Sequence, residues 1–331
     1  MKLIVTGGLG FIGSHYINEV IQDKSKKIYS FDFENYASNQ DQLKKFKKFK
    51  NFFHKKINIC NFDNLRKNFN IIKPDIVINF AAETHVDNSI LFSKRFIDSN
   101  IIGTFNLLEC SRLFLKKKKN HKFKYIQIST DEVYGDLKIN DKKKFSENSN
   151  FLPSSPYSAS KASSDLLVKA WYRTYKLPTI ITHSGNNFGP FQNQEKLIPK
   201  TIINILKGKK IPIYGKGNQI RNWIFVKDNV SAIQKIISKG IIGQSYNIGG
   251  KNELSNIDLV KYICLLVSDI SKKNSKKYLG LIKLVKDRAG HDIKYSLDNN
   301  KIKRLGWIEK KNFKQGLLET INWYMDKFND F

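Results

Sequence analysis

Two groups of residues in the middle of the chain carry side chains suited to acid–base chemistry. In the run 129–135, Ser-Thr-Asp-Glu-Val-Tyr-Gly, Asp131 and Glu132 are adjacent. In a second run, Tyr157 and Lys161 stand four residues apart and would share one face of a helix. A hydroxyl, an ammonium and two carboxylates that converge on one pocket could move protons to and from a sugar-like substrate.

The elements around these residues place them together. Residues 124–129 are an apolar run typical of a buried parallel strand, so the two acids follow its carboxyl end. In an open α/β sheet, ligands bind in the crevice beyond the carboxyl ends of the strands. A helix that starts after Pro156 would carry the Tyr/Lys pair. The sequence therefore predicts one pocket made by a strand end and a helix start.

The N-terminal segment predicts a dinucleotide site. A strand over residues 2–6 leads into Gly7, Gly10 and Gly13, and a helical stretch follows. Glycine permits a tight turn and lets the backbone approach a pyrophosphate, while the helix N-terminus offers N–H donors. This glycine spacing is weak on its own, but the strand before it and the helix after it make it specific.

Asp32 ends the second predicted strand, roughly twenty residues after the glycine turn. An acid at this place can accept hydrogen bonds from the adenosine ribose hydroxyls, which favours NAD over NADP, and no Arg lies beside it to receive a 2′-phosphate. Further along, Asn58 and Ile59 could border the adenine. The small side chains of Ala81 and Ala82 would let the cofactor ribose approach.

Up to residue 185, short apolar runs alternate with helical stretches, which is typical of a doubly wound parallel sheet. Beyond it, Gly, Pro and polar residues cluster and the connections become irregular. We therefore predict an α/β protein with a Rossmann-type, doubly wound NAD-binding domain over residues 1–185, to which 222–248 returns. Residues 186–221 and 249–331 would form a smaller, mixed α/β substrate-binding lobe.

The formal net charge of +29 at pH 7 could indicate a nucleic-acid or membrane-surface partner. The lysines are scattered along the chain, however, which favours solvated faces and predicts no nucleic-acid partner. An anionic substrate would still be captured faster in a positive field.

No apolar run is long enough to span a bilayer, and a strand begins at once after residue 1, so we expect no membrane partner and no targeting segment. Cys60, Cys110 and Cys264 show neither metal-ligand nor paired spacing. We expect no metal site and a reducing, cytoplasmic location.

The glycine turn together with Tyr157-Ser-Ala-Ser-Lys161 resembles the extended short-chain dehydrogenase/reductase family. Further segments narrow the resemblance to the dTDP-glucose 4,6-dehydratases, and their joint order and spacing are more specific than any one of them. These segments are 129–135, Asn186-Asn-Phe-Gly-Pro190, Glu195-Lys-Leu-Ile-Pro199, 214–223, Tyr246-Asn-Ile-Gly-Gly250 and Asp287-Arg-Ala-Gly-His-Asp292.

The chain departs from the family pattern at three positions. The family usually has Asp where Asn58 stands, and Arg where Asn88 and His183 stand. At position 183 a bidentate guanidinium is lost, which puts the local packing or an anion contact in question. None of the three positions is expected to carry the chemistry.

The resemblance implies that water is removed from C5 and C6 of a nucleotide-bound hexose, leaving a ketone at C4. Oxidation at C4 makes the C5–H α to a carbonyl, so that its removal becomes feasible. Tyr157 would take the C4 hydroxyl proton, with its pKa lowered by the cation of Lys161, and Thr130 would hold the C4 oxygen. Glu132 would be the base at C5 and Asp131 the acid at the C6 hydroxyl, since adjacent carboxylates titrate apart. The hydride finally returns to C6, so NAD should stay tightly bound and be recycled.

The resemblance also assigns the residues that contact cofactor and substrate. Around NAD it adds Phe11, Ile12, Asn100 and Ser129 to the residues above, with Tyr157 and Lys161 shared with the chemistry. Arg221 and Arg288 suit a diphosphate, because guanidinium forks match phosphate oxygens. The full substrate set is His85, Asn187, Glu195, Lys196, Arg221, Asn256, Arg288 and His291.

Several alternatives stay open at this point. His85 could be a catalytic base, but nothing near it in sequence activates it, which favours a structural or substrate-orienting role. A nucleotide-sugar 4-epimerase would need the Tyr/Lys pair but not the two acids, and a non-catalytic NAD-binding protein would need neither. The nucleotide could be dTDP, UDP, CDP or GDP. The family pairs subunits through two long helices, here expected near 93–118 and 156–175, so a homodimer is predicted.

Overall fold

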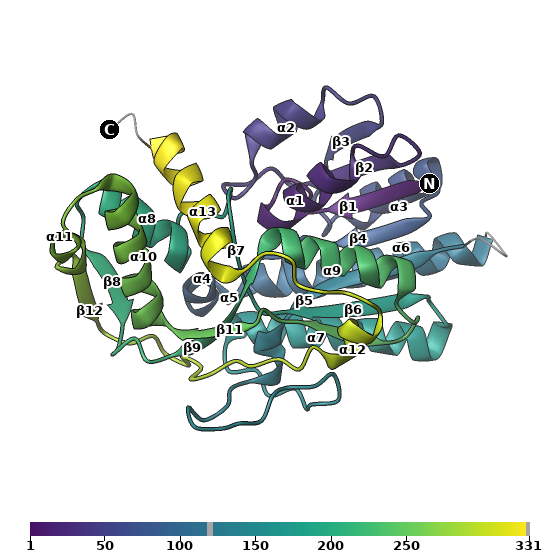
Figure 1. Cartoon of the computed structure of the whole chain (residues 1–331). Helices are drawn as coiled ribbons and strands as arrows, with labels where there is room; N and C mark the ends of the chain where they lie inside the picture. Colours follow the sequence, from purple (N-terminus) through teal and green to yellow (C-terminus); the bar gives the residue numbers. More distant parts are fainter. Residues whose placement is uncertain (118–121, 329–331) are drawn as a thin grey trace.

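A seven-stranded parallel sheet forms the larger part of the molecule. The computed structural model describes residues 1–117 and 122–328. Its strands pair in the order β10-β6-β5-β4-β1-β2-β3 (Figure 1). Their bounds are β1 Lys2–Thr6, β2 Lys27–Asp32, β3 Phe52–Lys56, β4 Ile76–Asn79, β5 Lys124–Thr130, β6 Thr179–Ser184 and β10 Ser245–Ile248. The chain order reverses between β1 and β4, and at such a switch point a crevice opens beyond the strand ends.

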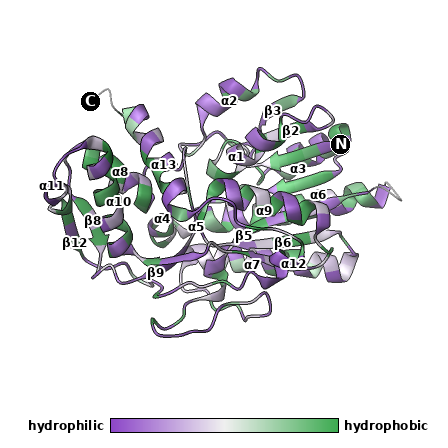
Figure 2. Ribbon diagram, viewed as in Figure 1, coloured by the Kyte–Doolittle hydropathy of each residue, from purple (hydrophilic) through white to green (hydrophobic). Residues whose placement is uncertain are grey.

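Helices cover both faces of this sheet, as the alternating sequence pattern predicts. One face buries apolar side chains of α1 (Phe11–Val20), α2 (Gln40–Phe46) and α9 (Val226–Lys239), together with Trp307. The other face buries those of α3 (Phe62–Ile72), α6 (Gly103–Lys117) and α7 (Pro156–Tyr175). The strands near the N-terminus carry the hydrophobic colour in Figure 2, as expected for a sheet covered on both sides. The predicted doubly wound α/β fold is confirmed.

A smaller lobe with its own apolar core lies beside the sheet (Figure 1). A three-stranded sheet, β11-β9-β7, and a two-stranded sheet, β12-β8, form its β-structure. The strand bounds are β7 Asn186–Phe188, β8 Ile211–Tyr214, β9 Ile220–Phe225, β11 Asn252–Ser255 and β12 Ile282–Val285. Its main helices are α8 Leu197–Leu206, α10 Asn256–Ser271 and α13 Phe313–Phe328, with the shorter α11 Ser275–Leu279; α12 Asn300–Arg304 packs against β10. The predicted lobe end at 329–331 lies outside the described residues.

The predicted long helix 93–118 is interrupted. The chain forms α5 (Ser93–Phe96), then a π-helical segment η1 (Ile97–Ile102), and then α6; residue 118 lies outside the described residues. The wider π turn holds Asn100, whose amide donates to the Glu83 carbonyl oxygen at 3.0 Å and accepts from the Glu83 N–H at 2.9 Å. This contact ties the helix to the loop after β4, near the start of α4 (Val86–Leu91). Periodicity alone could not reveal it.

The third strand, β3, stops before Asn58 and Ile59. It ends at Lys56, because the Asn58 side chain accepts a hydrogen bond from the Cys60 N–H at 2.9 Å and the chain turns there. No described helix is long and apolar enough to cross a membrane. Over residues 1–117 and 122–328, no group of three or more His, Cys, Asp and Glu side chains could hold a metal ion.

Candidate active site

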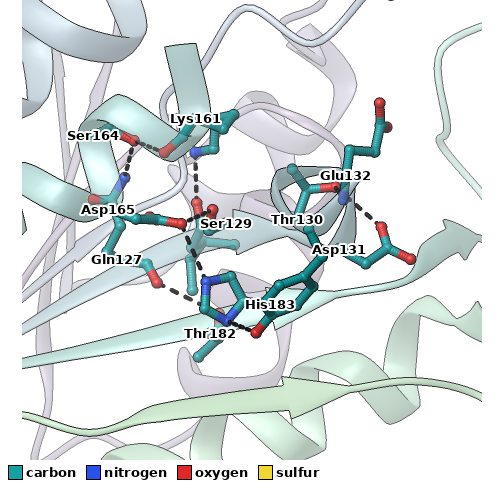
Figure 3. A network of polar contacts seen from close by, with 12 residues as sticks. Gln127, Ser129, Thr130, Asp131, Glu132, Lys161, Ser164, Asp165, Thr182 and His183 are labelled. Atoms are coloured by element: carbon teal, nitrogen blue, oxygen red, sulfur yellow. Dashed lines mark hydrogen bonds and ion pairs between the residues drawn. The ribbon is translucent and has the colours of Figure 1, made fainter. Parts of the chain in front are cut away.

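The acidic pair stands at the end of the central strand β5. A single 3-10 turn, η2 (Asp131–Tyr134), follows the strand, and the Thr130 hydroxyl caps it by accepting from the Glu132 N–H at 3.3 Å. The same hydroxyl donates to Oδ1 of Asp131 at 3.2 Å (Figure 3). Strand and cap therefore fix where both carboxyl groups lie.

The two acids have different surroundings. Asp131 is 2% exposed, and its Oδ2 is buried with no hydrogen-bond partner among the described residues. Burial, and then the charge of Glu132, raise the pKa of Asp131 well above its usual range. Burial also raises the pKa of Glu132, but Arg221 and Arg288 act in the opposite direction. Asp131 is therefore suited to keep its proton and act as the acid, whereas Glu132 can lose its proton and act as the base.

Tyr157 and Lys161 lie in the first turns of α7. Ser155 caps this helix in a capping box with Ser158, and Pro156 stands at its start, so the helix begins at a defined residue. The Lys161 ammonium is buried and donates to the Ile128 carbonyl oxygen at 2.7 Å. The α7 start and the β5 end thus meet, as the sequence predicts.

One electrostatic prediction is not met by the chain's own groups. The pKa of Tyr157 is raised well above its ordinary value, first by burial and then by the charge of Glu132, while a hydrogen bond with Thr130 acts to lower it. The cation of Lys161 was expected to lower the pKa of Tyr157, but its ammonium faces the Ile128 carbonyl instead.

The glycine turn fits a dinucleotide. Gly7 has φ of +63°, and a Cβ on Gly13 would lie 2.2 Å from the Gly7 carbonyl oxygen, so the turn is too tight for other residues. Helix α1 begins after Gly10 with no side-chain cap and no acidic residue in its first turn, as far as the structure describes the chain. Its N–H groups therefore remain available to a diphosphate. These residues fit NAD.

A cavity joins this turn to the acidic pair. Its lining includes Gly7, Gly10, Phe11, Ile12, Gly13, Ala82, Ser129, Thr130, Asp131, Glu132, Tyr157 and Lys161. These are twelve of the residues that we expect to bind NAD or carry the chemistry, drawn from four separate segments of the chain.

The remaining predicted cofactor residues lie outside this lining. Asp32 accepts from the Leu9 and Glu34 N–H groups at 3.0 and 2.9 Å, and its role toward the ribose stays a prediction. Ala81 packs against the Gly7 turn. Asn58 is exposed beyond β3, while Ile59 is buried against the Gly103 backbone. The Asn100 amide forms hydrogen bonds with Glu83 and Ser160, and its role toward NAD stays a prediction.

A second cavity, of about 440 Å³, opens between the sheet and the smaller lobe. All eight predicted substrate residues line it: His85, Asn187, Glu195, Lys196, Arg221, Asn256, Arg288 and His291. Glu132, Asn187 and Lys196 also line the first cavity, so the two spaces meet at Glu132. The Nε of Arg288 is buried without a partner among the described residues, and Arg221 is held by the Asp292 carbonyl oxygen at 2.9 Å.

Tyr295, Tyr214 and Asp87 are among the lining residues of this cavity that were not predicted. Tyr295 packs its ring 4.4 Å from the Arg221 guanidinium. Tyr214 donates to Asp87 at 3.1 Å, and the second oxygen of Asp87 lies 3.7 Å from Arg288. Tyr214 belongs to the segment 214–223 that carries the resemblance, so that signal could have found it; the meeting of Asp87 with Arg288 depends on the tertiary fold.

Comparison with known proteins identifies the family. A family model described as GDP-mannose 4,6 dehydratase matches residues 4–320. The dTDP-glucose 4,6-dehydratase of Haemophilus influenzae is 46% identical over 98% of this chain and 98% of its own length. That of Neisseria meningitidis serogroup B is 45% identical over 98% of this chain and 93% of its own. The chain belongs to the dTDP-glucose 4,6-dehydratase family.

Solved structures support the same assignment. A Streptomyces venezuelae dTDP-glucose 4,6-dehydratase with NAD bound matches with a TM-score of 0.90 and 35% identity, over 100% of this chain and 99% of that one. A UDP-glucuronic acid 4-epimerase of Bacillus cereus matches with a TM-score of 0.86 but only 25% identity, over 99% of this chain and 100% of that one. Epimerases are thus more distant than dehydratases, and both the family and the NAD cofactor predicted from the sequence are confirmed.

Proposed function

We propose that the chain converts dTDP-glucose to dTDP-4-keto-6-deoxyglucose and water, with NAD as a tightly bound, recycled cofactor. One observation carries this proposal. A buried acid that keeps its proton, Asp131, stands beside a base, Glu132, where the cofactor and substrate cavities meet. An oxidoreductase or an epimerase needs a base at one hydroxyl only. An elimination needs an acid and a second base as well.

The residues divide the reaction between them. The glycine turn would hold NAD, which would supply the hydride acceptor for C4 of the sugar and the hydride donor for C6. Tyr157, beside Thr130, takes the proton of the C4 hydroxyl. Glu132 removes the proton at C5, which the new C4 ketone has made acidic, and Asp131 gives its proton to the departing C6 hydroxyl. The double bond that forms between C5 and C6 is then reduced, so no net oxidation occurs.

The cations of the substrate cavity support an anionic nucleotide. Arg221, Arg288 and Lys196 line it. The buried Nε of Arg288 is an unused donor that a diphosphate oxygen would accept from. The choice of thymidine and glucose follows the family to which the chain belongs.

We also propose that two copies associate through η1, α6 and α7. Helices α6 and α7 contact each other, and the exposed apolar side chains here are Ile97 and Ile102 of η1, Phe105 of α6, and Leu166 and Tyr175 of α7. An apolar surface of this kind favours an interface. The division into an NAD-binding domain (1–185 and 222–248) and a sugar-binding domain is kept as part of the proposal, and three free cysteines support a reducing, cytoplasmic setting.

The test is incubation of the purified protein with dTDP-glucose and, separately, with UDP-glucose, UDP-N-acetylglucosamine and GDP-mannose. Mass spectrometry would follow loss of one water from each sugar. We expect loss from dTDP-glucose without added NAD. Loss from another sugar alone would correct the substrate, and inversion at C4 without any loss of water would show an epimerase instead.

A further inference from the structure

Behind the catalytic loop lies a fully buried histidine–aspartate contact that the mechanism does not use. His183 stands in β6, where it faces Ser129 of β5 on one side and Asn247 of β10 on the other. Its Nε2 lies 3.2 Å from Oδ2 of Asp165 on α7 (Figure 3), and both side chains are 0% exposed. The same Asp165 oxygen accepts from the Ser129 hydroxyl at 2.6 Å.

The hydrogen bonds around His183 fix its protons. The Asn247 amide donates to the Phe145 carbonyl oxygen at 2.8 Å, so its own oxygen faces Tyr134. The Tyr134 hydroxyl gives its single proton to that oxygen, at 2.8 Å. The Nδ1 of His183, 3.0 Å from the Tyr134 oxygen, must therefore donate. Because Nε2 faces the Asp165 carboxylate, both ring nitrogens of His183 have a hydrogen-bond acceptor beside them.

Asp165 connects this pair to the chemistry. It lies one helical turn after Lys161 on α7, so the two side chains share a face. Burial lowers the pKa of Lys161, and Asp165 is the charge that acts to raise it. The negative charge of Asp165 also acts to raise the pKa of Tyr157, so a cation next to Asp165 would reduce this increase.

We propose that His183 and Asp165 form a positioning pair for the dehydratase reaction. The His183 imidazolium holds the Asp165 carboxylate ionised and in place, and Asp165 in turn keeps Lys161 an ammonium and orients Ser129 at the end of β5. A doubly protonated His183 supplies the cation that pairs with Asp165. An unpaired carboxylate at this depth would be strongly destabilising.

The kinetic test compares His183→Gln with His183→Arg. Gln removes the cation, and we expect kcat to fall by about a hundredfold, the cost of misplacing a reacting group by roughly 1 Å. The KM for dTDP-glucose should stay within about twofold, because the pair lies outside the substrate cavity; Arg should restore most of kcat.

The double variant His183→Leu/Asp165→Leu distinguishes a positioning role from a purely structural one. Removing both charges should recover much of the thermal stability that each single change loses, while kcat stays low. Wild-type kcat in the double variant, or in a folded His183→Gln, would overturn the proposal.

A direct readout does not depend on activity. In protein labelled with ¹⁵N in its six histidines, the signal that is lost in His183→Gln should come from a ring with both nitrogens protonated at neutral pH. A bare ring nitrogen on His183 would overturn the proposal. The rate measurements rest on the proposed function, but the ¹⁵N spectrum does not. A wild-type protein without dehydratase activity would therefore refute the function and leave the pair to be judged by the spectrum.

Discussion

Replacing Glu132 by Gln tests the division of labour between the two acids. The change keeps the shape of a half-buried side chain but removes the base at C5. Loss of a general base costs about 10²- to 10⁴-fold, or roughly 2.7 to 5.4 kcal/mol in the barrier. The negative charge of Glu132 attracts Arg221 and Arg288. Its removal leaves both cations free for the nucleotide, so binding of dTDP-glucose should not weaken.

The assay, run in deuterated water, follows hydrogen exchange at C5 and release of water from C6. We expect Glu132→Gln to retain NAD, to oxidise C4 as seen by the absorbance of reduced NAD, and to lose both exchange at C5 and release of water. The matched variant Asp131→Asn, which keeps the base, should exchange C5 but release water slowly. Water loss from Glu132→Gln at more than about a tenth of the wild-type rate would refute the assignment of the base.

Three further predictions follow from the same geometry. Tyr157→Phe should lose the initial C4 oxidation, and the retained absorbance of reduced NAD on mixing with substrate would show that another base works there. The pKa values of Asp131 and Glu132 are both raised. Because Glu132 must be ionised, kcat/KM should fall as pH drops through the pKa of Glu132; because Asp131 must stay protonated, kcat/KM should also fall as pH rises through the pKa of Asp131. A pH profile that is flat across both limbs would contradict these roles. Arg288→Ala should weaken dTDP binding by about tenfold to a hundredfold, the loss of one charge-assisted hydrogen bond of about 1.5–3 kcal/mol, as measured by calorimetry; unchanged binding would remove Arg288 from the diphosphate site.

Much of the fold and the site could be predicted because their signals are local. The glycine turn combines its strand, its helix and its φ requirement within a dozen residues. The Tyr157/Lys161 pair is a helical spacing, and the acidic pair directly follows an apolar strand.

What the sequence did not reveal depends on contacts between distant segments. Asp165 is 36 residues from Ser129 and 18 from His183, and they meet only because β5 and β6 pair in a particular register. The π-helical segment that holds Asn100 leaves no mark in the apolar periodicity. The raised pKa of Tyr157 reflects burial and the nearby acids, which spacing to Lys161 cannot report.

The defined start of α7 has a consequence for the negative charge that forms on Tyr157 when it loses its proton. Tyr157 is the second residue of this 20-residue helix, and side chains on a helix lean toward its N-terminus. The peptide dipoles there amount to about half a positive elementary charge, already aligned before any proton moves. A phenolate formed at Tyr157 thus meets a field that needs no rearrangement, which offsets part of its burial. The two serines that fix the first turn are therefore part of the catalytic electrostatics, although neither needs to touch the sugar.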